Sequence, residues 1–68
     1  MLHTIVFDKT KYTPHEALSW CRRHDYKADK IDLTKHTIRV RQLAPITGAN
    51  YFTKKITEGI SMVFMVDT

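Results

Sequence analysis

The sequence predicts an α+β domain in which one helix packs on one face of a four- or five-stranded, mainly antiparallel sheet. Three observations lead to this class. Residues 37–42 alternate between apolar and polar side chains, as a strand with one buried and one solvated face does. A capping sequence that begins at Thr13 predicts one short helix. Apolar runs separated by polar or glycine-containing turns predict the remaining strands, in the order β-α-β-β-β-β.

The first strand is expected over residues 2–7, which are rich in β-branched and aromatic side chains. The helix is expected from Thr13 to about residue 24. Thr13 and Glu16 have the spacing of a capping box, and Pro14 takes the first helical position, where its missing N–H costs nothing. A helix this short needs tertiary packing, for which the sequence offers an apolar arc. The arc consists of Ala17, Trp20, Cys21 and His24, with Leu18 at its margin.

Trp20 is expected to be the main anchor of the helix on the sheet. If its ring is fully buried, Trp20→Ala should cost roughly 3–5 kcal/mol. No glycine follows the helix, so Asp25 is expected to take the left-handed conformation that ends it.

Four further strands are expected, over residues 28–33, 36–43, 51–57 and 60–66. The first two form a hairpin through the polar residues 34–36, and the last two turn at Glu58-Gly59. The loop over residues 43–50 contains Pro45, which cannot serve a central strand, and is expected to be mobile. Residues 60–66 are apolar on both faces, which predicts a central strand or one covered on both sides.

The 68 residues suffice for a single domain, 1–68, with a small core. The single cysteine excludes an internal disulfide and favours a reducing compartment. The longest apolar run, residues 62–66, is far too short to cross a bilayer, so no membrane association is expected. The net charge of +4 favours anionic partners such as nucleic acid, but it is weak evidence on its own.

The candidate binding residues lie on the face of the sheet that the helix does not cover. Arg39 and Arg41 are expected there, with Tyr51 and Lys55 if the strands are neighbours. Cations around an aromatic ring suit single-stranded nucleic acid, which needs charge for its phosphates and a ring for base stacking. The alternative is a solvated face on which the long Arg and Lys side chains shield apolar atoms.

A third interpretation gives the same face to a protein partner. Val63 and Met65 are apolar on a side without a helix, and an exposed apolar strip flanked by charge is typical of an interaction surface. The partner would be a host or viral protein or a second copy of the chain, and a homodimer would relieve the small core.

The sequence gives little support to metal binding or catalysis. Cys21 and His24 have a zinc-ligand spacing, but no second pair exists and Cys21 lies on the expected core arc. The same burial would deny Cys21 the exposed thiolate of a catalytic nucleophile. No glycine-rich phosphate loop or calcium loop is present. We therefore expect no cofactor, no metal site and no enzymatic activity.

The order of these features resembles a small domain of tailed-phage and large-DNA-virus proteins, which occurs alone in short reading frames or beside head-maturation proteases. The matching segments span most of the chain, although Met-Val-Asp near the end replaces an expected glycine. They are residues 17–20, 26–27, 30–32, 39–42, 54–56 and 58–60. The resemblance implies a viral origin and a non-enzymatic role. We therefore expect a small viral accessory protein in the cytoplasm of the infected host cell. It would bind nucleic acid or a nucleoprotein complex, or alternatively inhibit a host or defence protein or serve as a virion or scaffold component.

Overall fold

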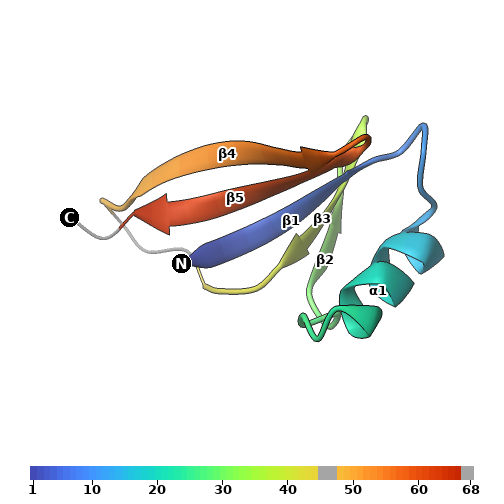
Figure 1. Ribbon diagram of the computed structural model, residues 1–68, viewed down its shortest axis with the longest axis horizontal. Helices are drawn as coiled ribbons and strands as arrows, with labels where there is room; N and C mark the ends of the chain where they lie inside the picture. Colours follow the sequence, from blue (N-terminus) through green and yellow to red (C-terminus); the bar gives the residue numbers. More distant parts are fainter. Residues whose placement is uncertain (45–47, 67–68) are drawn as a thin grey trace.

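The structure is a computed structural model that describes residues 1–44 and 48–66. These residues form one helix and a five-stranded sheet, so the expected α+β class and element order are confirmed (Figure 1). In chain order the elements are β1 (Leu2–Asp8), α1 (Pro14–Arg23), β2 (Ile31–Leu33), β3 (Thr37–Arg41), β4 (Asn50–Thr57) and β5 (Ile60–Val66). The loop predicted over residues 43–50 includes 45–47, which lie outside the described residues.

The strands lie in the order β2-β3-β1-β5-β4, and every neighbouring pair is antiparallel. β1 is the middle strand, with β3 on one side and β5 on the other. β2 therefore runs parallel to β1 with β3 between them, and α1 makes the connection from one to the other. β5 is an internal strand, as its two apolar faces predict.

Both ends of α1 are capped as the sequence predicts. The Thr13 hydroxyl accepts from the Glu16 N–H at 3.2 Å, and the Glu16 carboxylate accepts from the Thr13 N–H at 2.9 Å. Asp25 takes a left-handed φ of 63°. The Tyr26 N–H donates to the Cys21 carbonyl at 2.8 Å, which completes a Schellman-type end without glycine. The helix boundaries are thus set by local side chains and backbone.

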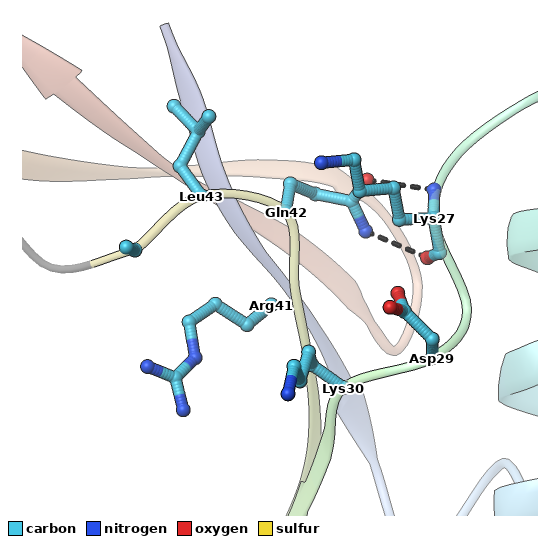
Figure 2. Close-up of a pocket in the computed structure, with 7 residues that line it drawn as sticks. Lys27, Asp29, Lys30, Arg41, Gln42 and Leu43 are labelled. Atoms are coloured by element: carbon cyan, nitrogen blue, oxygen red, sulfur yellow. Dashed lines mark hydrogen bonds between the residues drawn. The ribbon is translucent and has the colours of Figure 1, made fainter.

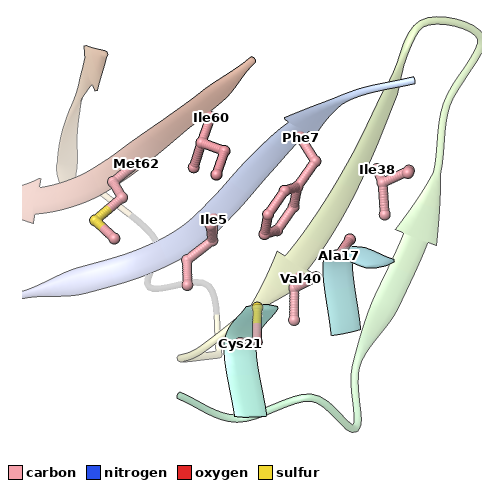
Figure 3. Packing of buried hydrophobic residues seen from close by; sticks show 8 residues of the cluster. All are labelled: Ile5, Phe7, Ala17, Cys21, Ile38, Val40, Ile60 and Met62. Atoms are coloured by element: carbon pink, nitrogen blue, oxygen red, sulfur yellow. The ribbon is translucent and has the colours of Figure 1, made fainter. Parts of the chain in front are cut away.

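The core lies between α1 and the middle three strands (Figure 3). The helix contributes Ala17 and Cys21, both fully buried. The strands contribute side chains that alternate along the chain on the side facing the helix. They are Ile5 and Phe7 of β1, Ile38 and Val40 of β3, and Ile60 and Met62 of β5.

Trp20 and His24 depart from the expected core arc. Trp20 is only partly buried, and His24 is exposed. The Trp20 ring packs edge-on against Phe7, with centroids 5.6 Å apart, and its faces are covered by His24 and Tyr26 at 4.1 and 6.0 Å. Trp20 therefore lies at the rim of the core rather than at its centre. The destabilisation expected of Trp20→Ala assumed a fully buried ring, so it does not apply.

The helix does not reach the far edge of the sheet. α1 packs against β3, and β4 lies on the opposite side of the molecule (Figure 1). All eight residues of β4 are exposed as a result. At the other edge β2 is shorter than the predicted strand 28–33, and its Ile31 and Leu33 are 36% and 58% exposed.

Candidate functional site

The pairing of the strands places all six candidate residues on the same side of the sheet. Paired residues of neighbouring strands carry their side chains on one face. Arg39 pairs with Val6, which pairs with Ser61, which pairs with Lys55. In the same way Arg41 pairs with Thr4, which leads to Val63, and Tyr51 pairs with Met65. This side, opposite the core residues, is called the open face below.

The open face is not uniformly accessible. Lys55 and Tyr51 are exposed, whereas Arg39 and Arg41 are half-buried and keep their charged ends near solvent. Met65 is only 6% exposed, so the expected apolar strip of Val63 and Met65 is wrong for Met65. The rings of His3 and Tyr51 meet edge to face across β5, with centroids 5.0 Å apart, at the position of Met65.

His3 is a member of the open face that sequence reasoning missed. Strict alternation along β1 would place it with Ile5 and Phe7 on the core side. The register with β5 shifts between Leu2 and Thr4, and this irregularity turns His3 to the opposite side. The sequence carries no local signal for the shift.

The environment of His3 disfavours its protonation. Nδ1 lies 2.7 Å from the Thr4 hydroxyl, while Nε2 is buried without a hydrogen-bond partner among the described residues. Burial lowers the pKa of His3, and the charges of Arg41 and Arg39 lower it further. The ring is therefore kept neutral beside two guanidinium groups.

A hollow of about 280 Å³ on the open face is lined by both arginines, His3, Thr4 and Asp32. Arg41 lies 3.8 Å from the Asp32 carboxylate, in an ion pair that is open to solvent on the Asp32 side and so contributes little. Arg39 makes no ion pair within the described part of the chain. Of the two guanidinium groups, that of Arg39 is therefore the more available to a ligand.

Arg41 also lines a second hollow, of about 370 Å³, at the end of β3 (Figure 2). Lys27, Asp29 and Lys30 surround this hollow with Arg41 and Gln42. The Gln42 amide fixes the Lys27 backbone through two hydrogen bonds of 2.8 Å, one donated and one accepted. The backbone N–H of Arg41 donates to the backbone carbonyl of Lys30 at 2.9 Å.

The two hollows together define a basic track, which consists of Lys27, Lys30, Arg41 and Arg39. Two carboxylates, Asp29 and Asp32, line the same hollows, so the cations outnumber the anions by two to one. Lys27 and Lys30 were not among the expected site residues. The place of Lys27 depends on the Gln42 side chain, whose contact with Lys27 spans 15 residues and leaves no periodic signal in the sequence. The place of Lys30 depends on its backbone hydrogen bond with Arg41.

Lys55 stands apart from the basic track. Three strand spacings separate it from Arg39, about 14 Å across the sheet. Its ammonium lies 4.0 Å from Glu58, which also pairs with Lys11 at 3.3 Å. Lys55 is thus a second, partly neutralised cationic point on the same face.

Cys21 is fully buried, and burial raises the pKa of its thiol to about 11 although the charge of Arg22 acts in the opposite direction. Residues 1–44 and 48–66 contain no group of three or more His, Cys, Asp or Glu side chains that could hold a metal ion. No helix among them is long and apolar enough to span a membrane.

No protein-family model, curated protein or solved structure matches the chain.

Proposed function

We propose that this chain is a non-enzymatic binding protein whose open face holds single-stranded nucleic acid, alone or within a nucleoprotein complex. The observation that carries the proposal is the position of Arg41, which lines both hollows and so joins Lys27 and Lys30 to Arg39. A groove lined by cations can track a phosphate backbone. The resemblance to a domain of phage and large-DNA-virus proteins supports a viral accessory role in the infected host cell.

The same face offers a place for bases beside the place for phosphates. Tyr51 is 42% exposed and leans on His3, so part of its ring can stack on an unpaired base. Lys55 would contact a phosphate further along the strand. A sheet face with an accessible ring and flanking cations favours single strands over duplexes, whose bases are not free to stack on a protein.

The proposal is tested by fluorescence anisotropy with a labelled single-stranded oligonucleotide at several salt concentrations. Arg39→Ala combined with Arg41→Ala should weaken binding at least about tenfold at low salt. It should also reduce the slope of log K against log salt by about 1.4, which corresponds to two lost phosphate contacts on a single strand. The matched control is Arg22→Ala combined with Arg23→Ala, which removes two exposed charges from the end of α1.

If the two double variants weaken binding equally, only net charge matters and the open face is not the site. If the wild type does not bind single strands even at low salt, nucleic-acid binding itself is refuted. A duplex of the same sequence serves as the competitor, because a preference for the duplex would contradict the role given to Tyr51.

Binding to a protein is the second candidate, and it covers inhibition of a host or defence protein and a scaffold role. Since Met65 is buried, the accessible apolar side chains lie elsewhere than the sequence suggested. Several of those among the described residues lie on β4, where Phe52 and Ile56 are 49% and 44% exposed. Binding there should tolerate salt and be lost in Phe52→Lys, while the double arginine variant should leave it unchanged.

A further inference from the structure

The two edges of the sheet differ in a way that the proposed function does not explain. The edge strand β2 has three residues, whereas the edge strand β4 has eight. No strand among the described residues pairs with the outer side of β4. Long unprotected edges present unpaired backbone N–H and C=O groups and are templates for another strand.

The side chains of β4 add apolar surface to this open edge. Phe52 is 49% exposed and stacks on Phe64, with centroids 5.3 Å apart and planes inclined by 20°. Tyr51 is 42% exposed on the opposite face. Between these aromatics and the turn lie Lys54 and Lys55, which would oppose pairing in most arrangements.

We propose that the outer edge of β4 pairs antiparallel with the β4 edge of a second copy. The two copies are related by a two-fold axis that passes midway between their Thr53 residues, which lie directly opposite each other. An axis perpendicular to the sheet keeps the same face upward in both copies. Residues directly opposite each other must share a face. The pair at the axis is therefore two copies of one residue, and the axis cannot lie level with the midpoint between two successive residues of the strand.

The lysines exclude two of the possible centres and favour Thr53. An axis at Lys54 or at Lys55 would place two identical ammonium groups directly opposite each other, which is destabilising. An axis at Thr53 places each lysine opposite an aromatic ring. Phe52 then faces the second copy's Lys54, and Tyr51 faces the second copy's Lys55, in contacts that favour a cation.

The regular part of β4 fits the same centre. The register with β5 shifts between Lys55 and Thr57, so the regularly paired part of β4 ends at Lys55. Thr53 lies within this regular part, which begins at Asn50. The two Phe52 rings would then be diagonal neighbours, within reach of each other for aromatic side chains.

Such a dimer would have one continuous sheet of ten strands. Both helices would lie on one side and both open faces on the other, so Arg39 and Arg41 of both copies would lie on one surface. The pairing does not depend on nucleic acid, and its test contains none.

Sedimentation equilibrium over a range of concentrations up to about 1 mM tests the association. The wild type should form dimers, and Phe52→Lys should raise the dimer dissociation constant at least about tenfold, because the new ammonium would face Lys54 at both symmetric positions. Leu33→Lys is the matched control. Leu33 is 58% exposed on the same face of the other edge strand, and its replacement should leave the constant unchanged.

Disulfide trapping tests the register. An axis at Thr53 brings the two Cα atoms of that residue to about 4.5–5.5 Å, within the range of a disulfide. Thr53→Cys should therefore form a covalent dimer when diamide accepts the two electrons and two protons of the paired thiols. Lys55→Cys, on the same strand and face, should not, because its two copies would lie about 13 Å apart. Cys21 is buried and does not compete.

A protein that stays monomeric throughout the concentration range would overturn the proposal. A dimer that Leu33→Lys disrupts and Phe52→Lys spares would place the interface on β2 and would also overturn it. Trapping of Lys55→Cys in preference to Thr53→Cys would refute the axis. Circular dichroism melts establish that each variant is folded, as their exposed positions predict.

Discussion

The thiol of Cys21 lies on the buried face of α1, where burial raises its pKa to about 11 from an ordinary value of 9.0. Below about pH 9 the thiol is neutral in both the folded and the unfolded chain, so its ionisation does not affect stability. Between about pH 9 and pH 11 the unfolded chain releases the proton and the folded chain retains it. The free energy of unfolding should therefore fall in this window.

The prediction is a loss of about 2 kcal/mol at about pH 10.5 relative to pH 8, beyond the loss shown by Cys21→Ala. Urea denaturation of both proteins at the two pH values measures it. Other groups titrate at high pH in both proteins alike, so the difference reports the thiol. Parallel losses in the two proteins would mean that Cys21 is solvated in the native state.

His3 gives a second prediction at the scale of one residue. Burial is the main cause of its lowered pKa, and Arg41 and Arg39 add to it. Arg41→Gln should raise the pKa of His3, while Arg22→Gln, which alters a distant charge, should not. An NMR titration of the imidazole Cε1 proton measures both effects. An unchanged pKa in Arg41→Gln would show that the arginine does not face the ring.

The sign of the His3 effect on stability follows from the same environment. Its pKa is lower in the folded chain, so the unfolded chain binds the proton more readily as the pH falls below about 6.5. The stability contributed by the neutral ring is complete above that pH and is lost at lower pH. Phosphates bound at Arg39 and Arg41 would offset the two charges and raise the pKa of His3.

At the scale of elements, the β4-β5 turn depends on Gly59. Its φ is +81°, and a Cβ there would lie 2.8 Å from Cδ of Lys11 and 3.1 Å from Cε2 of Tyr12. Gly48 has the same φ, but no described atom lies within 4 Å of its Cβ position. Gly48→Ala should cost about 1 kcal/mol for the backbone alone.

Gly59→Ala should cost more, about 2–3 kcal/mol, because the Tyr12 ring packs on Phe7 and cannot move freely. Chemical denaturation of the two variants compares the costs directly. Equal losses would show that the Lys11-Tyr12 segment yields to a methyl group without penalty.

The elements themselves could be predicted because their causes are local. The capping box of Thr13 and Glu16, the left-handed Asp25 and the alternation around Arg39 each depend on neighbours in the chain. The pairing irregularity at His3 could not be predicted, because it arises from the fit of β1 to β5. The burial of Met65 could not be predicted either, because it depends on segments distant in the sequence, such as Met1, that the fold brings beside it.

At the scale of the whole molecule, the sheet is wider than its one short helix can cover. The core is confined to the region between α1 and the middle three strands, and Trp20 closes its rim. The candidate site shares this origin. Arg39 and Arg41 could be assigned to an uncovered face from alternation alone. Lys27 joins them only through its contact with Gln42, and Lys30 only through its backbone hydrogen bond with Arg41, both of which the folded chain provides.

This arrangement predicts the order in which backbone amides exchange with solvent. β1 pairs on both sides and carries Ile5 and Phe7, so its amides should exchange most slowly. The edge strands β2 and β4 should exchange faster. If β4 pairs with a second copy, its outward-facing amides should slow as the protein concentration rises, whereas those of β2 should not.

Hydrogen exchange followed by NMR at two concentrations about tenfold apart measures both effects. Phe52→Lys is the internal control, because it should abolish the concentration dependence in β4 and leave the protection of β1 in place. Faster exchange in β1 than in β4 would contradict the position of the core. Rates in β4 that do not change with concentration would contradict its pairing, because an amide hydrogen-bonded across the dimer opens only when the two copies separate or the strand frays.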